Sequence, residues 1–205
     1  PVDAFQGAVP NSEIDAFVAK VIETSGGEVN GGLSDALNSA EEMLEGGATS
    51  DAAEVFSAII EEDNQNVKAY SGLARAKLDL EDIEGAEAVL NGVPADISDS
   101  PEIEAVFAKI SLARQALDVG PLSELEAVVA ADPSNSKARF EYSQALYAAD
   151  NIDEAVAQLL ELFGRDSDWN DGAAKAQLFT IFDALEPNDP IVLNGRRKLS
   201  SMIFA

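Results

Sequence analysis

Basic side chains are scarce in this sequence, and two of them give the first indication of a binding chemistry. The 205 residues include 13 lysines and arginines against 38 aspartates and glutamates. Lys68 and Arg75 are two helical turns apart in register, so on a helix they would share one face. An ammonium and a guanidinium group on one face could grip a carboxylate or an acidic peptide. The competing interpretation is that both form ion pairs with nearby carboxylates on a solvated surface, and the abundance of carboxylates favours it.

The groups that most enzymes use for covalent or metal chemistry are missing. The sequence has no cysteine and no histidine, which excludes thiol nucleophiles, disulfides and the usual zinc ligands within this chain. Carboxylates occur throughout, so no single pair stands out as an acid–base couple. We therefore expect no catalytic residues, no metal site and no cofactor, and we interpret the protein as a non-enzyme.

One acidic loop has some features of a calcium-binding loop. It carries Asp166, Asp168 and Asn170 at alternate positions, followed by Asp171. An EF-hand loop needs glycine at its sixth position and glutamate at its twelfth. Here those positions hold Asp171 and Gln177. We interpret the segment as an acidic turn with helix caps rather than as a metal site.

The composition favours a helical protein with a sizeable core. Hydrophobic residues make up 46% of the chain and aromatic residues 6%, which suits close-packed helices better than a β-sandwich. The net charge of -25 would repel nucleic acids and anionic membranes. No apolar run approaches the roughly 20 residues of a membrane span. We expect neither nucleic-acid nor membrane partners.

An alanine followed four positions later by a large apolar residue recurs along the chain. The three pairs are Ala52/Phe56, Ala86/Leu90 and Ala155/Leu159. A period of roughly 34 residues with A-x-x-x-F in the second helix is the pattern of tetratricopeptide repeats. The first two alanines are one such period apart, and the last two are close to two periods apart. The small alanine lets the two helices of a hairpin approach closely.

This period predicts an all-α, tetratricopeptide-like superhelix of about five antiparallel helix hairpins over residues 33–205. In the third repeat Pro121 takes the alanine position, so the second helix should start there. The acidic turns at Asp82 and Asn151 should open the second helices of their repeats with capping side chains. The four expected repeats and the closing hairpin span residues 33–66, 67–100, 102–135, 136–169 and 171–205.

First helices line the concave face of tetratricopeptide arrays, through roughly their second, fifth and ninth positions. This placement predicts a protein-binding groove in which the scarce basic residues Lys68, Arg75, Lys109 and Lys137 face one surface. The candidate groove residues are Lys68, Ser71, Arg75, Lys109, Lys137, Phe140 and Gln144.

The last helix should begin at Pro190 with Asp189 as its cap, and its end is strongly apolar. It either caps the last hairpin or docks on a partner, and because apolar helix faces are usually core the cap is favoured. The candidate docking residues are Arg196, Arg197, Leu199, Met202, Ile203 and Phe204.

The beginning of the chain, residues 1–25, differs from the repeats. The segment Phe5–Ala8 is followed by an amphipathic pattern from Ile14 to Ile22, which looks like the last strand and helix of a thioredoxin domain. Residues 26–32 contain two glycine pairs without the lysine of a phosphate loop, so we interpret them as a flexible linker.

A thioredoxin-like tail followed by tetratricopeptide hairpins resembles the YbbN-type thioredoxin-like proteins of bacteria, also called chaperedoxins. The pattern Leu178-Phe179-x-x-Phe182-Asp183, then Asp189-Pro190, then Arg196-Arg197 is similar to the closing segment of that family. The resemblance implies a cytoplasmic co-chaperone that holds unfolding clients and cooperates with chaperonin and Hsp70-type chaperones.

The first functional hypothesis is therefore a protein-binding scaffold with a chaperone-associated role. The alternative is a passive oligomerisation or docking arm for an upstream thioredoxin-like redox domain. A third possibility is a thioredoxin-linked redox enzyme in which this part only docks the substrate.

Overall fold

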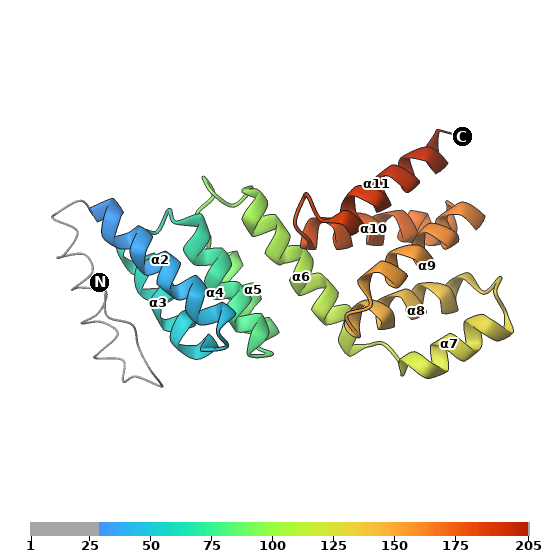
Figure 1. Ribbon diagram of the computed structural model, residues 1–205, viewed down its shortest axis with the longest axis horizontal. Coiled ribbons are helices and arrows are strands. Elements are labelled where there is room, and N and C mark those ends of the chain that lie inside the picture. Colours follow the sequence, from blue (N-terminus) through green and yellow to red (C-terminus); the bar gives the residue numbers. More distant parts are fainter. Residues whose placement is uncertain (1–28, 205) are drawn as a thin grey trace. The chain divides into compact units, whose positions relative to one another are not determined.

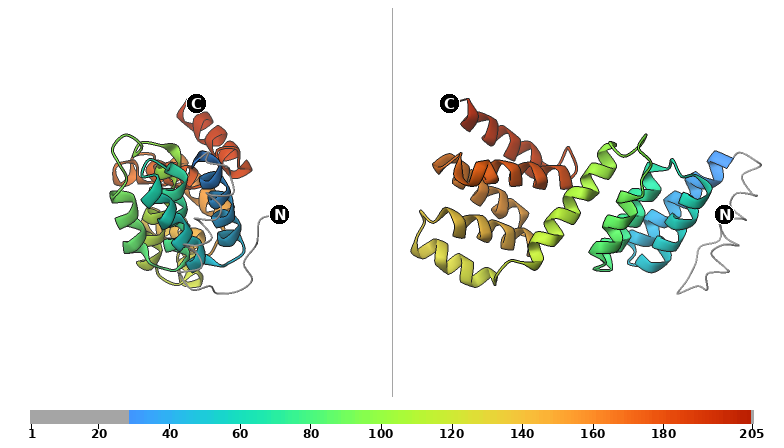
Figure 2. Two further views of the ribbon diagram at one scale, coloured as in Figure 1. Left: turned by 90° about the vertical axis from the view of Figure 1, so that its left-hand side faces the viewer. Right: turned by 180° about the vertical axis from the view of Figure 1, so that it is seen from behind.

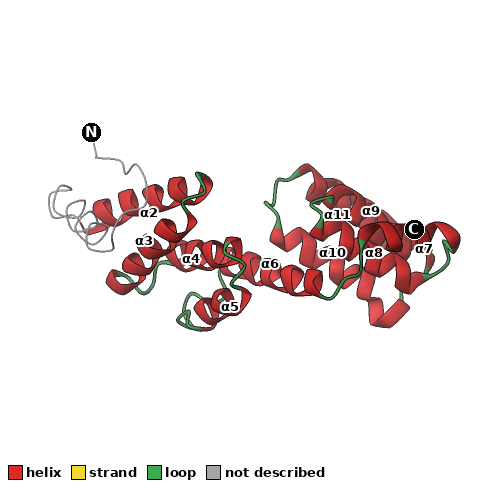
Figure 3. Cartoon of the chain, turned by 90° about the horizontal axis from the view of Figure 1, so that it is seen from below, coloured by secondary structure: helices red, strands yellow, loops and turns green. Residues whose placement is uncertain are grey.

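The computed structural model describes residues 29–204, and this part of the chain is helical (Figure 1). It contains ten α-helices and one short 3-10 helix, with no strand among the described residues. Figure 3 shows the helices joined by loops and turns. The chain divides into two compact units between Val106 and Phe107. The expected all-α, tetratricopeptide-like architecture is thus confirmed.

The first unit is built from two helix pairs. Within it α2 packs on α3, α3 on α4 and α4 on α5, and α2 also contacts α4. Asn66 caps α4 by accepting a hydrogen bond from the N–H of Ala69, at 3.1 Å. The helices are α2 (Val29–Glu45), α3 (Thr49–Glu62), α4 (Val67–Asp79) and α5 (Ile83–Asn91).

The core of this unit lies between α2 and α3, with the start of α4 packed against it. Phe56 is fully buried among small and branched side chains of α2 and α3. Gly72 of α4 lies directly against it, because a β-carbon at Gly72 would come within 2.4 Å of the Phe56 ring. The close approach of α3 and α4 therefore depends on a glycine facing a phenylalanine.

The second unit contains the later helices, of which α6 (Pro101–Leu117) crosses the division between the units. Here α7 packs on α8, α8 on α9, and both α10 and α11 pack on α9. The right-hand view of Figure 2 shows α8 and α9 next to each other. The remaining elements are α7 (Leu122–Ala131), α8 (Ser136–Ala148), α9 (Ile152–Arg165), the 3-10 helix η1 (Trp169–Gly172), α10 (Ala173–Ala184) and α11 (Pro190–Ile203). Three of the five expected hairpins pack as pairs, α2 with α3, α4 with α5 and α8 with α9, whereas α7 packs mainly on α8, and α10 and α11 each pack mainly on α9.

Equivalent positions two repeats apart adopt the same local structure. Asn135 caps α8 through the N–H of Ala138, at 3.0 Å, as Asn66 caps α4. Glu81 and Asp150 close their turns with the same positive φ of 61°. The predicted repeat register is confirmed, and α7 begins directly after Pro121 as expected.

The two acidic turns behave differently. Asp82 caps α5 by accepting a hydrogen bond from the N–H of Gly85, at 2.9 Å. The Lys77 ammonium also donates to this carboxylate, and these hydrogen bonds hold the pKa of Asp82 below its usual value. Asn151 precedes α9 but makes no side-chain cap hydrogen bond, so that expectation is wrong. Instead, the carboxylates of Asp153 and Glu154 lie in the first turn of α9 and interact favourably with its dipole.

The expected linker is also partly wrong. Helix α2 already begins at Val29, so residues 29–32 are helical rather than flexible. Gly32 and Leu33 are both buried, and packing outweighs the low helix propensity of glycine. The predicted thioredoxin-like tail of residues 1–25 lies outside the described residues.

Replacing Ala86 with leucine tests the helix packing at the repeat signature. Ala86 is fully buried on α5, so the larger side chain must displace its neighbours. We expect the free energy of unfolding to fall by about 1–3 kcal/mol. Urea denaturation of the full chain measures this, and an unchanged midpoint would show that the signature alanine does not face a tight contact.

Candidate protein-binding surfaces

Helix α4 carries three of the predicted groove residues, and only one of them is free to bind. The Arg75 guanidinium pairs with the carboxylate of Glu41 on α2, with 2.5 Å between the nitrogen and the oxygen. Ser71 is buried, and its hydroxyl donates to the carbonyl oxygen of Lys68 at 3.1 Å. Lys68 is exposed, and its ammonium has no carboxylate within ion-pair distance in the described part of the chain. The ion-pair interpretation thus holds for Arg75, whereas Lys68 is available.

The other predicted groove residues belong to the second unit. Lys137 is exposed and pairs loosely with Glu141 one turn along α8, at 3.6 Å. Lys109 lies on α6. Lys68 and Arg75 belong to the first unit, so the placement of all four basic side chains on one surface stays a prediction.

Phe140 and Gln144 take part in contacts that connect α8 with other elements of the second unit. The Phe140 ring lies 5.4 Å from that of Trp169, centroid to centroid. The side-chain amide of Gln144 donates to Oε1 of Gln115, at 2.9 Å. The amide of Gln177 donates to the same oxygen, at 2.6 Å. A cluster of three glutamines therefore links α6, α8 and α10, the first helices of three successive expected hairpins.

Sequence reasoning found Gln144 but missed its two partners. Gln177 follows Gln144 by about one repeat period, and this spacing was a usable signal. Gln115 precedes Gln144 by clearly less than one period, because the third repeat departs from the regular spacing. The period alone therefore does not point to Gln115.

One face of α11 closes the core of the second unit. Val192, Gly195 and Leu199 are buried, and a β-carbon at Gly195 would come within 2.6 Å of the Phe182 ring on α10. Leu199 is only 2% exposed, so it belongs to the core and not to a docking face. That part of the docking hypothesis is wrong, because the helix turns this residue into the core that it shares with α9 and α10.

The remaining candidate residues of α11 face solvent. Met202 and Ile203 are partly exposed, and Phe204 is 86% exposed. Arg196 pairs with Asp183 at 3.4 Å, and its guanidinium lies 5.8 Å from the centre of the Phe182 ring. Arg197 donates to the side chain of Asn194, at 3.3 Å. Arg196 thus connects α11 to α10, and Arg197 makes a hydrogen bond within α11. The apolar residues at the end of α11 remain exposed to solvent.

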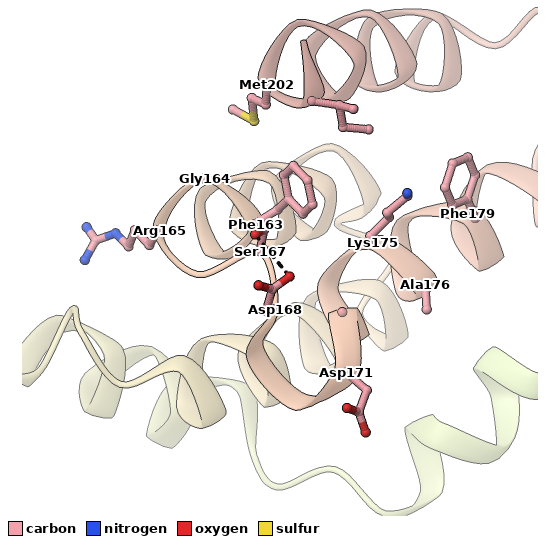
Figure 4. Close-up of a pocket in the computed structure, with 12 residues that line it drawn as sticks. Phe163, Gly164, Arg165, Ser167, Asp168, Asp171, Lys175, Ala176, Phe179 and Met202 are labelled. Carbon is pink, nitrogen blue, oxygen red and sulfur yellow. Dashed lines mark hydrogen bonds between the residues drawn. The ribbon is translucent and has the colours of Figure 1, made fainter. Parts of the chain in front are cut away.

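An open cleft of about 1150 Å³ lies beside this apolar end (Figure 4). Its walls come from the end of α9, from η1, from the first half of α10 and from the last turn of α11. Sequence reasoning did not predict it, because its residues come from segments that are separate in the chain. They are Phe163, Gly164, Arg165, Ser167, Asp168, Asp171, Gly172, Lys175, Ala176, Phe179, Met202 and Ile203.

The acidic loop that has features of a calcium site forms one wall of the cleft. Asn170 and Asp171 both have positive φ, as does Gly172 at the start of α10. The loop makes the turn between α9 and α10, as expected, but Asp168 contributes no cap hydrogen bond to η1. Among residues 29–204 no group of three or more acidic side chains is placed to hold a metal ion.

Residues 29–204 contain no helix with the length and apolar character needed to cross a membrane.

Comparisons with known proteins place these helix pairs in a family. Residues 36–110 and residues 115–204 each match a family model described as a tetratricopeptide repeat. Over 142 residues the chain is 26% identical to an uncharacterised protein of Haemophilus influenzae, and the match covers 69% of this chain and 64% of that protein. The chain therefore spans less than two thirds of the length of this relative.

One solved structure also matches most of this chain. The crystal structure of a domain from a Vibrio parahaemolyticus protein of unknown function is 24% identical to this chain, with a TM-score of 0.39. The match covers 82% of this chain and 98% of that domain. With the two family matches and the helix pairs described above, the chain contains a tetratricopeptide-repeat region, a helical scaffold of the kind that binds other proteins.

Proposed function

We propose that this chain is a co-chaperone that holds unfolding client proteins and cooperates with a chaperonin or an Hsp70-type chaperone. One observation carries the proposal, which is the exposure of large apolar side chains on the last two helices. Three of them, Phe179, Met202 and Ile203, line one cleft, and Leu193 and Phe204 are exposed elsewhere on α11 and at its end. Contiguous exposed apolar side chains on a protein surface are a common sign of a protein-binding site.

The charge of the chain supports the same role. Unfolding proteins expose apolar segments, and a holding protein must bind them without precipitating with them. A net charge of -25 keeps such a complex dispersed through repulsion. The resemblance of the sequence to YbbN-type proteins supports the finer choice of chaperonin and Hsp70-type partners.

Protection of a model client from aggregation tests this proposal. Citrate synthase is heated with the full chain, and light scattering is followed over time. The proposal expects suppressed scattering at equimolar chain and none with an equally acidic control protein. Scattering that is the same with and without the chain contradicts the holding role.

Helix α4 supplies a second test, aimed at the predicted groove. Replacing Lys68 with glutamate removes an unpaired cation without disturbing the Arg75–Glu41 pair. We expect client binding at low salt to weaken by about threefold to tenfold, the equivalent of about 1 kcal/mol. Titration by fluorescence anisotropy measures the change. Lys198→Glu makes the same charge change at an exposed position of α11, outside the predicted groove. Unchanged binding in Lys68→Glu would remove the case for a groove on α4, whatever the effect of Lys198→Glu.

A further inference from the structure

The cleft beside α11 has apolar walls that are exposed yet held in place. Phe163 packs partly against the core of the unit, and Phe179 makes an edge-to-face contact with the buried Phe182, with ring centres 6.4 Å apart. Met202 and Ile203 face the cleft from the last turn of α11. Two fixed rings and an adaptable methionine suit the insertion of another large apolar side chain.

A lysine side chain lies among these walls. Figure 4 shows the Lys175 side chain reaching between Phe163 and Phe179 toward the helix of Met202. Its ammonium has no carboxylate within ion-pair distance in the part of the chain that the structure describes. Arg165, the other cation of the cleft, donates hydrogen bonds to the Glu161 carboxylate at 2.6 Å and to the carbonyl oxygen of Pro133 at 2.8 Å. Because Lys175 is exposed and the cleft is open, water screens the attraction between its ammonium and an incoming anion, so a single ion pair here adds only modestly to binding.

The two carboxylates of the cleft restrict where that anion can lie. Asp168 accepts a hydrogen bond from the hydroxyl of Ser167, at 3.5 Å, and Asp171 points away from the helix of Met202 (Figure 4). Both belong to the wall opposite α11. A ligand with several negative charges would be repelled there, whereas one carboxylate on the α11 side meets only Lys175.

We propose that this cleft binds an internal, extended segment of a partner protein in which glutamate or aspartate follows a large apolar residue by two positions, so that both side chains lie on the same side of the segment. The apolar side chain lies against Phe163, Phe179 and Met202, and the carboxylate pairs with the Lys175 ammonium. An internal segment fits because the cleft is open, so that a chain can pass through it. The inference rests on the proposed function, since it names a recognition site through which a protein-binding scaffold would select its partners.

Short peptides with blocked ends test the site in the full chain. The first carries Leu-Phe-Glu between glycine and serine residues, with an acetylated start, an amidated end and a fluorescent label. The second differs only in glutamine for glutamate. By anisotropy we expect the glutamate peptide to bind up to roughly fivefold more tightly, because it alone pairs with Lys175. Failure of both peptides to bind, or equal affinities for the two, overturns the proposal.

Lys175→Met assigns the difference to one side chain. Lys175 is exposed, so the variant is expected to fold normally, which its thermal denaturation checks. The preference for the glutamate peptide should disappear in Lys175→Met and persist in the matched variant Lys198→Met. A preference that survives in Lys175→Met overturns the assignment. Phe179→Ser should weaken both peptides equally, and unchanged binding in that variant also contradicts the proposal.

Further measurements separate other occupants and the broader function. A third peptide ends in Leu-Phe with a free carboxylate. If it binds more tightly than the glutamate peptide, the ligand of the cleft is a chain end and not an internal segment. Sedimentation showing a dimer that Lys175→Met dissociates would make a second copy of this chain the occupant. Client protection that persists without peptide discrimination rejects this site alone, whereas peptide discrimination without client protection rejects the holding role.

Discussion

Replacing Phe182 with alanine is expected to lower the free energy of unfolding of the second unit by about 3–5 kcal/mol. The ring is 1% exposed, and it fills the space that Gly195 of α11 leaves open. Alanine would leave a cavity between α10 and α11, and Arg196 would lose the ring beneath its guanidinium. Urea denaturation measures the loss, and hydrogen exchange should show faster opening of α11.

Phe179→Ala is the matched control for this prediction. It removes the same kind of side chain one turn earlier on α10, where the ring is 41% exposed and forms part of the cleft. We expect a stability change of less than about 1 kcal/mol together with weaker peptide binding. If the two variants were equally destabilised, the separation of α10 into a core face and a cleft face would be wrong.

Glu161→Gln is expected to destabilise the second unit by about 2–3 kcal/mol, more than removal of its buried partner does. Arg139 is a buried cation of α8, and its guanidinium donates to Glu161 at 2.9 Å, to the carbonyl oxygen of Pro133 at 3.0 Å, and to the side chain of Gln158. Glu161 supplies the negative charge in this network. Its removal leaves the guanidinium buried and unneutralised.

Arg139→Met should cost less, because it removes the buried charge itself and leaves Glu161 paired with Arg165. The double variant should be close to Arg139→Met alone, since the glutamate matters chiefly through the arginine. Glu141→Gln, which loses only the exposed pair with Lys137, should change stability by less than about 0.5 kcal/mol. Chemical denaturation of the four variants gives the order. A larger loss in Arg139→Met than in Glu161→Gln would mean that the arginine contributes mainly by its packing.

The repeat could be predicted because tightly packed helix positions require small residues at regular intervals along the sequence. Ala52, Ala86 and Ala155 are all fully buried, so each stands where a larger residue would force two helices apart. The turns are also recorded, since Asn66 and Asn135 are helix caps in equivalent positions. These local requirements recur in each repeat, which is why a single sequence was enough to reveal the helix order.

The binding surfaces were less predictable, because they depend on contacts between repeats. The sequence favoured an ion pair for Arg75 but did not identify its partner, because Glu41 lies one repeat earlier. Leu199 has the spacing of a docking residue, yet the helix turns it into the core. The cleft is assembled from α9, η1, α10 and α11, and no local pattern marks Lys175 within it.

Titration of the full chain with a permanently unfolded protein tests the central claim most directly. Reduced and carboxymethylated α-lactalbumin serves as the unfolded partner, and the native form of the same protein is the control. If the chain is a scaffold for unfolding clients, calorimetry should show saturable binding of the unfolded form, weaker binding by the Phe179→Ala variant, and no binding of the native form. Absence of saturable binding to the unfolded protein, or equal binding of both forms, would contradict the account.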